Sequence, residues 1–203
     1  MSAYATRPAL RHRVGSRWET TTWAEYGETV DRVAAALGGL GLEPGDRVGL
    51  LSSNRREWHF ADVGTICGGA VTVPVYMTSS AAQVAYILDH SEARFCFVEG
   101  HEQLAKVLES RHALPHLERV IMFEADGCDL SDPFLIGWGD LCSLGEERLA
   151  KEPALLDDRV GSIRPADLAT IVYTSETTGP PKGAMITHAN LIATLDHQGL
   201  RRA

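Results

Sequence analysis

The sequence has few cysteines and no Cys-x-x-Cys pair. Its four cysteines, at positions 67, 96, 128 and 142, are far apart, and two of them lie in apolar stretches. A disulfide framework is therefore disfavoured, and reduced thiols are expected. The chain also lacks an excess of basic residues, since its formal charge is −8 and its pI about 5.4. A general nucleic-acid-binding protein needs a concentrated basic surface, so this class is disfavoured as well.

Neither a secretory signal nor a membrane-spanning helix is indicated. The residues before Glu19 include arginines and no acid, as in a transit peptide, but Pro8 and Gly15 interrupt an amphipathic helix and no apolar core is present. We expect an exposed leader to the first strand. The stretch from Val63 to Leu88 has no charged residue, yet its glycines, Pro74 and hydroxyl residues break a spanning helix. The predicted location is the cytoplasm, with peripheral membrane contact as the alternative.

The pattern of apolar residues predicts an α/β fold. With 203 residues, of which 44% are hydrophobic and 23% charged, the composition is that of a globular domain with one sizeable core. Helices are predicted after Thr22 and Ser80, which form capping-box patterns with Glu25 and Gln83. Nearly continuous apolar runs predict strands over 47–52, 70–75, 93–99, 119–123 and 167–174. This alternation predicts a mostly parallel sheet with helices on both faces.

The chain is predicted to form one domain over 1–203. Within it, 124–166 is rich in Gly, Asp, Pro and Ser, and only one helix, near 138–150, is indicated there. We interpret 124–166 as a long surface excursion. After the strand that ends at Thr174, a short extended segment over 184–187 and a helix from about His188 are expected.

The segment from Tyr173 to Gly183, YTSETTGPPKG, carries the chemistry. Hydroxyl groups and backbone N–H groups in a glycine-containing loop can surround phosphate oxygens, and a lysine adds a positive charge. A plain surface turn is the alternative, because turns favour the same residues. A Walker P-loop requires a Ser or Thr after the lysine and a helix directly afterwards; here Gly183 follows Lys182 and an extended segment intervenes.

The same string resembles the signature YTSGTTGxPKG of the adenylate-forming, AMP-binding enzymes, and the flanks DLATIVYTS and ITHANL agree. Upstream, NRREW, VPVYMTSS and VAYILDHSEARFCFVE resemble the long-chain fatty acyl-CoA synthetase branch. The resemblance covers nearly the whole chain and is weakest between Asp126 and Asp167. It implies that ATP, with Mg, activates a fatty acid to an acyl-adenylate, and that the acyl group then passes to coenzyme A. The residues that would hold the ATP phosphates are Thr174, Ser175, Thr177, Thr178, Gly179 and Lys182.

The resemblance also implies that this is the N-terminal portion of an AMP-binding domain, with the C-terminal remainder absent. In the family the main catalytic lysine, the ribose-binding acidic residue, the adenine pocket and the acyl tunnel lie C-terminal to the motif. No catalytic residue is therefore expected within this chain, and it is expected to be inactive alone. The alternative is a non-catalytic remnant or split half that associates with a chain carrying the missing part. A free-standing nucleotide-binding module is the third possibility.

One position departs from the signature, because Glu176 stands where the family has glycine. If this position requires a positive φ, a side chain costs about 1–2 kcal/mol. A carboxylate near a phosphate adds a repulsion of about 4 kcal/mol at an effective dielectric constant of about 20. No metal site is expected: His112 and His116 have helical ligand spacing, but Pro115 separates them and no third ligand is evident.

Overall fold

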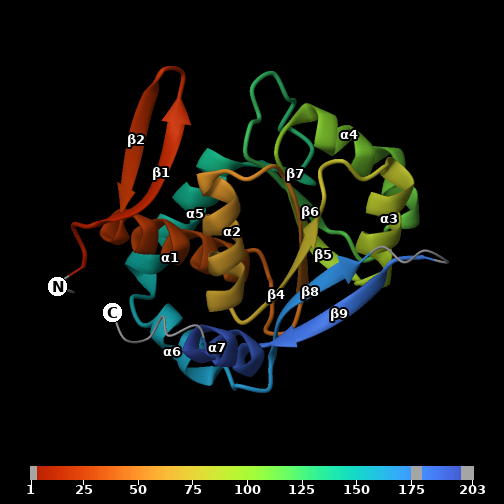
Figure 1. Ribbon diagram of the computed structural model, residues 1–203. Helices are drawn as coiled ribbons and strands as arrows, with labels where there is room; N and C mark the ends of the chain where they lie inside the picture. The colour runs from red at the N-terminus through yellow and green to blue at the C-terminus, as the bar shows by residue number, and fades with distance from the viewer. Residues whose placement is uncertain (1–3, 175–179, 198–203) are drawn as a thin grey trace.

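The computed structural model describes residues 4–174 and 180–197. Its centre is a seven-stranded sheet in the order β7-β6-β5-β3-β4-β8-β9, with helices on both faces (Figure 1). All neighbouring strands are parallel except β8 and β9, which are antiparallel. The strands of this sheet are β3 (Arg47–Leu51), β4 (Val71–Val75), β5 (Ala93–Val98), β6 (Arg119–Met122), β7 (Leu135–Gly137), β8 (Leu168–Thr174) and β9 (Lys182–Thr187). The predicted fold class is confirmed.

The helices are α1 (Trp23–Gly39), α2 (Arg56–Cys67), α3 (Ala81–His90), α4 (His101–Glu109), η1 (Arg111–Ala113), α5 (Trp138–Lys151), α6 (Leu155–Ser162) and α7 (His188–His197). Helices α1, α3, α5 and α7 lie where the sequence predicts a helix, whereas η1 and α6 were not predicted. Both predicted capping boxes are present: Thr22 and Glu25 bond reciprocally at the start of α1, and Ser80 and Gln83 do so at the start of α3. These bonds satisfy backbone N–H groups that the first helical turn leaves unpaired.

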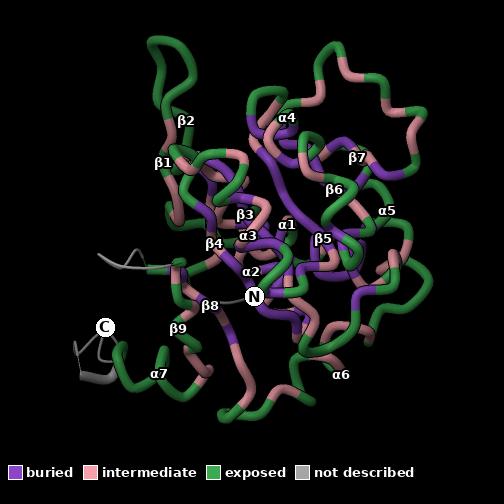
Figure 2. The backbone as a smooth tube through the Cα atoms, turned by 90° about the vertical axis from the view of Figure 1, so that its right-hand side faces the viewer, coloured by how far each residue is buried: buried purple, intermediate pink, exposed green. Residues whose placement is uncertain are grey.

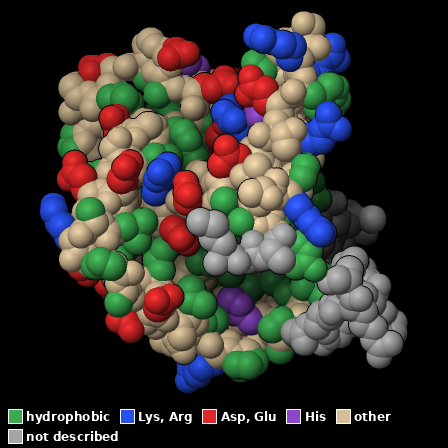
Figure 3. All heavy atoms as spheres, turned by 90° about the vertical axis from the view of Figure 1, so that its left-hand side faces the viewer, with side chains coloured by type: hydrophobic (Ala, Val, Ile, Leu, Met, Phe, Trp, Pro, Cys, Tyr) green, Lys and Arg blue, Asp and Glu red, His purple; other side chains and the backbone are tan. Residues whose placement is uncertain are grey.

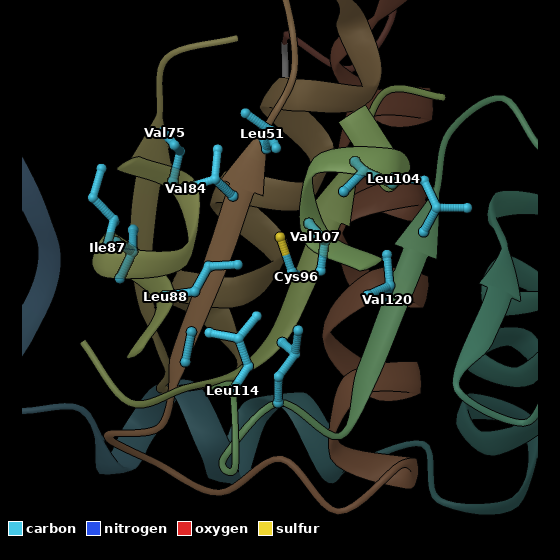
Figure 4. Packing of buried hydrophobic residues seen from close by; sticks show 14 of the residues in the cluster. Leu51, Val75, Val84, Ile87, Leu88, Cys96, Leu104, Val107, Leu114 and Val120 are labelled. Atoms are coloured by element: carbon cyan, nitrogen blue, oxygen red, sulfur yellow. The ribbon is translucent and has the colours of Figure 1, made fainter. Parts of the chain in front are cut away.

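Successive side chains of each strand point to opposite faces of the sheet, so the interior has two hydrophobic cores. On β5, Phe95 and Phe97 point to one face of the sheet, whereas Cys96 and Val98 point to the other. The first face is covered by α1, α2 and α5, and the second by α3 and α4. Figure 4 shows the second core, in which side chains of α3 and α4 pack on β3, β5 and β6. Figure 2 shows that the central strands are buried along most of their length.

The direction in which the chain adds strands to the sheet reverses at β3. The chain passes from β3 through α2 to β4 on one side, and then crosses back through α3 to β5 on the other. In open α/β sheets, ligands bind beyond the carboxyl ends of strands near such a reversal. The carboxyl ends of β3, β4 and β8 lie at this edge, and β8 leads directly into the segment that resembles the phosphate signature.

The N-terminal segment is more ordered than predicted. Instead of an exposed leader, β1 (Pro8–Val14) and β2 (Arg17–Thr22) form an antiparallel hairpin that projects from the start of α1 (Figure 1). The turn places Gly15 at a φ of 59°, a conformation that favours glycine. The missed signal was this Gly-Ser pair between two segments of strand length, which is typical of a two-residue hairpin.

Segment 124–166 contributes to the sheet and to one core. Strand β7 pairs with β6 at the edge of the sheet, and α5 packs closely on α1 with Leu141 fully buried. Helix α5 is the one helix that the sequence indicated here. Strand β7 has only three residues and α6 buries none, so neither leaves a clear periodic pattern in the sequence.

The uncharged stretch from Val63 to Leu88 does not form one helix. It contains the end of α2, strand β4 and most of α3. Among the described residues, no helix is both long enough and apolar enough to cross a membrane.

The close contact between α1 and α5 depends on glycine at position 145. A Cβ atom on Gly145 would lie 1.9 Å from the carbonyl oxygen of Arg32, which is backbone and cannot swing aside. We therefore expect Gly145→Ala to lower the free energy of unfolding by about 3 kcal/mol, because the two helices must separate. Urea denaturation followed by circular dichroism measures this loss.

Gly139 on the same helix provides the matched control. A Cβ atom there would meet nothing within 4 Å. Gly139→Ala should therefore stabilise the protein by a few tenths of a kcal/mol up to about 1 kcal/mol, through helix propensity alone. Equal effects of the two substitutions would contradict the close packing of α5 on α1.

Candidate functional site

The two ends of the signature segment lie opposite each other at the edge of the sheet. Thr174 is the last residue of β8 and Lys182 the first of β9, and the two are partners in the antiparallel register. Both are exposed. Of the predicted phosphate-binding residues, the structure describes these two. The others, and the motif departure, lie outside the described residues: Ser175, Glu176, Thr177, Thr178 and Gly179.

Helix α3 holds both strands that flank the segment. The hydroxyl of Tyr86 donates a hydrogen bond to the carbonyl oxygen of Pro181 (3.2 Å), one residue before Lys182. His90, one turn later, lies with its Nδ1 2.7 Å from the hydroxyl of Tyr173. The rings of Tyr86 and His90 are stacked, and both meet the ring of Tyr173 edge-on. Tyr173 and Pro181, which lie on either side of residues 175–179, are thereby both held by α3.

Tyr173 is buried, and this burial, together with the neighbouring Tyr86, raises the pKa of its phenol above the ordinary value. On the facing strand β9, there is no room for a side chain at Gly183. A Cβ atom there would lie 2.8 Å from Ile171 Cγ2 and 3.2 Å from the Tyr173 ring. A glycine after Lys182 is thus required for β9 to approach β8 so closely. Tyr86 and His90 are not among the site residues predicted from the sequence, although their spacing of four residues places both on one face of α3.

A pocket of about 430 Å³ adjoins the segment at the carboxyl ends of β3, β4 and β8. Its lining is mostly apolar, and polar atoms come from Ser52, Ser53 and Asn54. The remaining lining residues are Trp58, Pro74, Val75, Tyr76, Met77, Val172 and Tyr173. An apolar pocket with a few polar groups, next to a candidate phosphate loop, is the usual form of a small-molecule site. This pocket was not predicted from the sequence, because its residues come from distant parts of the chain.

An ionic cluster lies beyond the carboxyl ends of β3 and β5. The carboxylate of Glu99 accepts hydrogen bonds from the backbone N–H of Ser53 (2.6 Å) and the hydroxyl of Ser52 (3.2 Å). Although burial opposes ionisation, these bonds hold the pKa of Glu99 below its ordinary value. Arg55 Nη1 lies 3.9 Å from Glu99 Oε1 and 2.7 Å from Glu124 Oε1.

The described residues provide no ready-made metal site. Over 4–174 and 180–197, no group of three or more His, Cys, Asp or Glu side chains could hold a metal ion. His112 lies in η1 and His116 in the following turn, so the two do not share a helical face.

We expect Tyr86→Phe to loosen the β9 side of the segment. The substitution keeps the aromatic contacts and removes one hydrogen bond, so the free energy of unfolding should fall by about 1 kcal/mol. Hydrogen exchange of the β9 amides should accelerate. Tyr26→Phe is the control: it removes a longer bond, to the carbonyl oxygen of His59 (3.4 Å), and should leave β9 exchange unchanged. Unaltered β9 exchange in Tyr86→Phe would contradict the anchoring role.

Comparisons with known proteins agree with this arrangement. A family model described as AMP-binding enzyme matches residues 1–202. A long-chain-fatty-acid–CoA ligase of Xenopus laevis, ACSBG2, is 34% identical over 194 residues, which are 96% of this chain and 26% of the relative. The ligase FadD15 of Mycobacterium bovis is 37% identical over 175 residues, covering 86% of this chain and 28% of the relative. The chain thus spans about a quarter of the length of these curated relatives.

Solved structures share the fold. A fatty acyl CoA synthetase of Mycobacterium tuberculosis superposes with a TM-score of 0.64 at 27% sequence identity. The match covers 84% of this chain and 30% of that one.

Proposed function

Because the chain belongs to the AMP-binding enzyme family, we propose that it forms the ATP-phosphate-binding part of a long-chain fatty acid–CoA ligase. The reaction is the ATP-dependent activation of a fatty acid to an acyl-adenylate, followed by thioester formation with coenzyme A. The observation that carries this proposal is the YTSETTGPPKG sequence, of which the described residues Thr174, at the end of β8, and Lys182, at the start of β9, lie opposite each other. Both named curated relatives are long-chain-fatty-acid–CoA ligases.

In this proposal each group has a physical task. Lys182 supplies a positive charge for a phosphate oxygen, while hydroxyl groups of Thr174, Ser175, Thr177 and Thr178 and the backbone at Gly179 donate hydrogen bonds. Tyr86 and His90 are positioning residues, because they hold the flanking strands and not the nucleotide. Mg belongs with the bound ATP and not with a site of its own in the described residues. The catalytic groups of the ligase reaction are proposed to lie outside these 203 residues.

The test is whether ATP binding depends on Lys182. It is best made in a Glu176→Gly background, which removes the expected repulsion at the motif. Ligand-observed NMR with ATP and Mg should show at least tenfold weaker binding after Lys182→Ala, since an ion pair with phosphate is lost. Lys151→Ala is the matched control, because Lys151 lies at the end of α5 and its side chain is 77% exposed. Equal binding by the two variants would overturn the proposed phosphate site.

A second candidate function, a split half that associates with a chain carrying the missing part, rests on apolar side chains at the end of the sheet. Met185 on β9 is 69% exposed, and Leu191, Ile192 and Leu195 on α7 are also exposed. Figure 2 shows no buried segment along α7. A mostly parallel sheet needs both faces covered, so a further polypeptide layer over β9 and α7 would satisfy this requirement.

The split-half candidate predicts poor behaviour of the chain alone. We expect binding of a hydrophobic dye, broad thermal unfolding and concentration-dependent association, all reduced by co-expression with the downstream portion of a related synthetase. Met185→Gln with Leu195→Gln should reduce association, whereas Val160→Gln, which changes an exposed valine on α6, should not. A sharply melting monomer that binds no dye would contradict this candidate.

A further inference from the structure

One of the four cysteines lies beside a histidine whose ring is held in a fixed orientation. The Sγ atom of Cys128 is 3.4 Å from Nδ1 and 3.5 Å from Nε2 of His101. Nε2 of the same ring is 2.7 Å from the carbonyl oxygen of Asp126. A carbonyl oxygen only accepts hydrogen bonds, so Nε2 carries the proton of the neutral ring and Nδ1 is left as an acceptor. The basic nitrogen of His101 is therefore within reach of the Cys128 thiol.

The two residues meet because β5 and β6 are parallel neighbours, whose carboxyl ends lie at the same edge of the sheet. Helix α4 follows β5 and begins with His101, and the loop that holds Cys128 follows β6, beside α4 (Figure 1). The loop turns at Gly127, whose φ is 75°, and the N–H of Cys128 donates to the carbonyl oxygen of Ala125 (3.0 Å). The thiol thus lies near the first turn of α4, where the helix dipole favours negative charge on sulfur.

The other three cysteines have a different environment. Cys96 is fully buried in the core that Figure 4 shows, and this burial raises the pKa of its thiol to about 12. Burial also raises the pKa of the Cys67 and Cys142 thiols, although both side chains are partly exposed. Within the part of the chain that the structure describes, Cys128 is the one cysteine with a histidine nitrogen in hydrogen-bonding range. Cys128 is itself partly exposed, so a small reagent can reach it.

From this arrangement we propose that Cys128 and His101 form a site of oxidative modification, at which the thiol reacts with hydrogen peroxide. Nδ1 of His101 takes the thiol proton while the sulfur attacks one peroxide oxygen, so that an S–O bond forms and the O–O bond breaks. The departing hydroxide takes the proton from the imidazolium and leaves as water. Sulfur is oxidised by two electrons to a sulfenic acid, and the peroxide is reduced by the same two electrons.

The charge around the site favours a small neutral reagent. Glu124, Asp126 and Asp129 belong to the same loop as Cys128, and the formal charge of the chain is −8. Figure 3 shows that acidic side chains are also spread over one whole face of the molecule. An anionic electrophile is repelled by such a field, whereas hydrogen peroxide is uncharged and approaches freely.

The proposal is tested by treating the whole chain with hydrogen peroxide and dimedone, which traps sulfenic acids, and quantifying each cysteine by peptide mass spectrometry. Cys128 should be labelled about tenfold faster than Cys142, because a positioned base assists its reaction. His101→Gln should slow the labelling of Cys128 by about tenfold and leave Cys142 unchanged, since an amide accepts no proton. The matched control is His112→Gln, which changes an exposed histidine in η1 and should leave the rate at Cys128 unaltered.

Labelling in urea separates the effect of the base from that of exposure. In the unfolded chain Cys128 and Cys142 should react at similar rates, and His101→Gln should match the wild type, because the contact with His101 is then lost. Iodoacetamide, a neutral alkylating reagent, should give the same order of rates in the folded chain. The proposal is overturned if folded Cys128 reacts no faster than Cys142, or if His101→Gln reacts as fast as the wild type. Equal slowing by His101→Gln and His112→Gln would also overturn it.

Discussion

A protein consisting of these 203 residues is expected to form no acyl-adenylate and no acyl-CoA. The chain corresponds to about a quarter of the length of its curated relatives, and the resemblance places the main catalytic lysine and the adenine pocket in the remainder. Phosphate binding alone does not orient a carboxylate for attack on ATP, and that orientation supplies much of an enzyme's rate enhancement. The expected loss is therefore the whole of the catalysed rate, and not a fraction of it.

Pyrophosphate release measures this outcome directly. The chain is incubated with ATP, Mg, palmitate and coenzyme A, and a full-length relative such as FadD15 serves as the positive control. We expect a signal equal to that of the buffer blank. Turnover above the blank that disappears in Lys182→Ala would contradict the prediction, because it would show that the chain itself carries the complete reaction.

The second large effect is expected from Glu176→Gly. A carboxylate about 4 Å from a phosphate repels it by about 4 kcal/mol at an effective dielectric constant of about 20, which corresponds to nearly a thousandfold in affinity. If the backbone requires a positive φ, glycine removes a further cost of about 1–2 kcal/mol. ATP should therefore bind very weakly to the wild-type chain and up to about a thousandfold more tightly to the variant. Calorimetry or ligand-observed NMR compares the two.

Glu176→Gln separates the two contributions. Glutamine removes the charge and keeps the side chain, so it should recover most of the gain if repulsion dominates, and little of it if the backbone conformation dominates. Glu152→Gln, at the end of α5, controls for a general change in net charge and should leave affinity unchanged. If the wild-type chain and Glu176→Gly bind ATP with equal affinity, neither charge repulsion nor the backbone conformation at position 176 weakens binding, and the prediction is wrong.

Most of the fold could be predicted from local patterns. Strands buried on both faces appear as apolar runs, and the capping boxes at Thr22 and Ser80 mark where α1 and α3 begin. The hairpin was missed because its strands are largely exposed and lack the alternation that a buried face imposes. Strand β7 was missed because three residues are too short for any periodicity.

Part of the candidate site could also be predicted from the sequence and part could not. The sequence by itself determined the signature segment, the departure at Glu176 and the resemblance to ligases, because these depend on residues that are adjacent in the chain. Only the tertiary structure decided that α3 anchors both ends of the loop through Tyr86 and His90, that an apolar pocket opens beside it, and that His101 lies beside Cys128. Such contacts depend on strand order and register, which arise from packing between distant segments and leave no local pattern in the sequence.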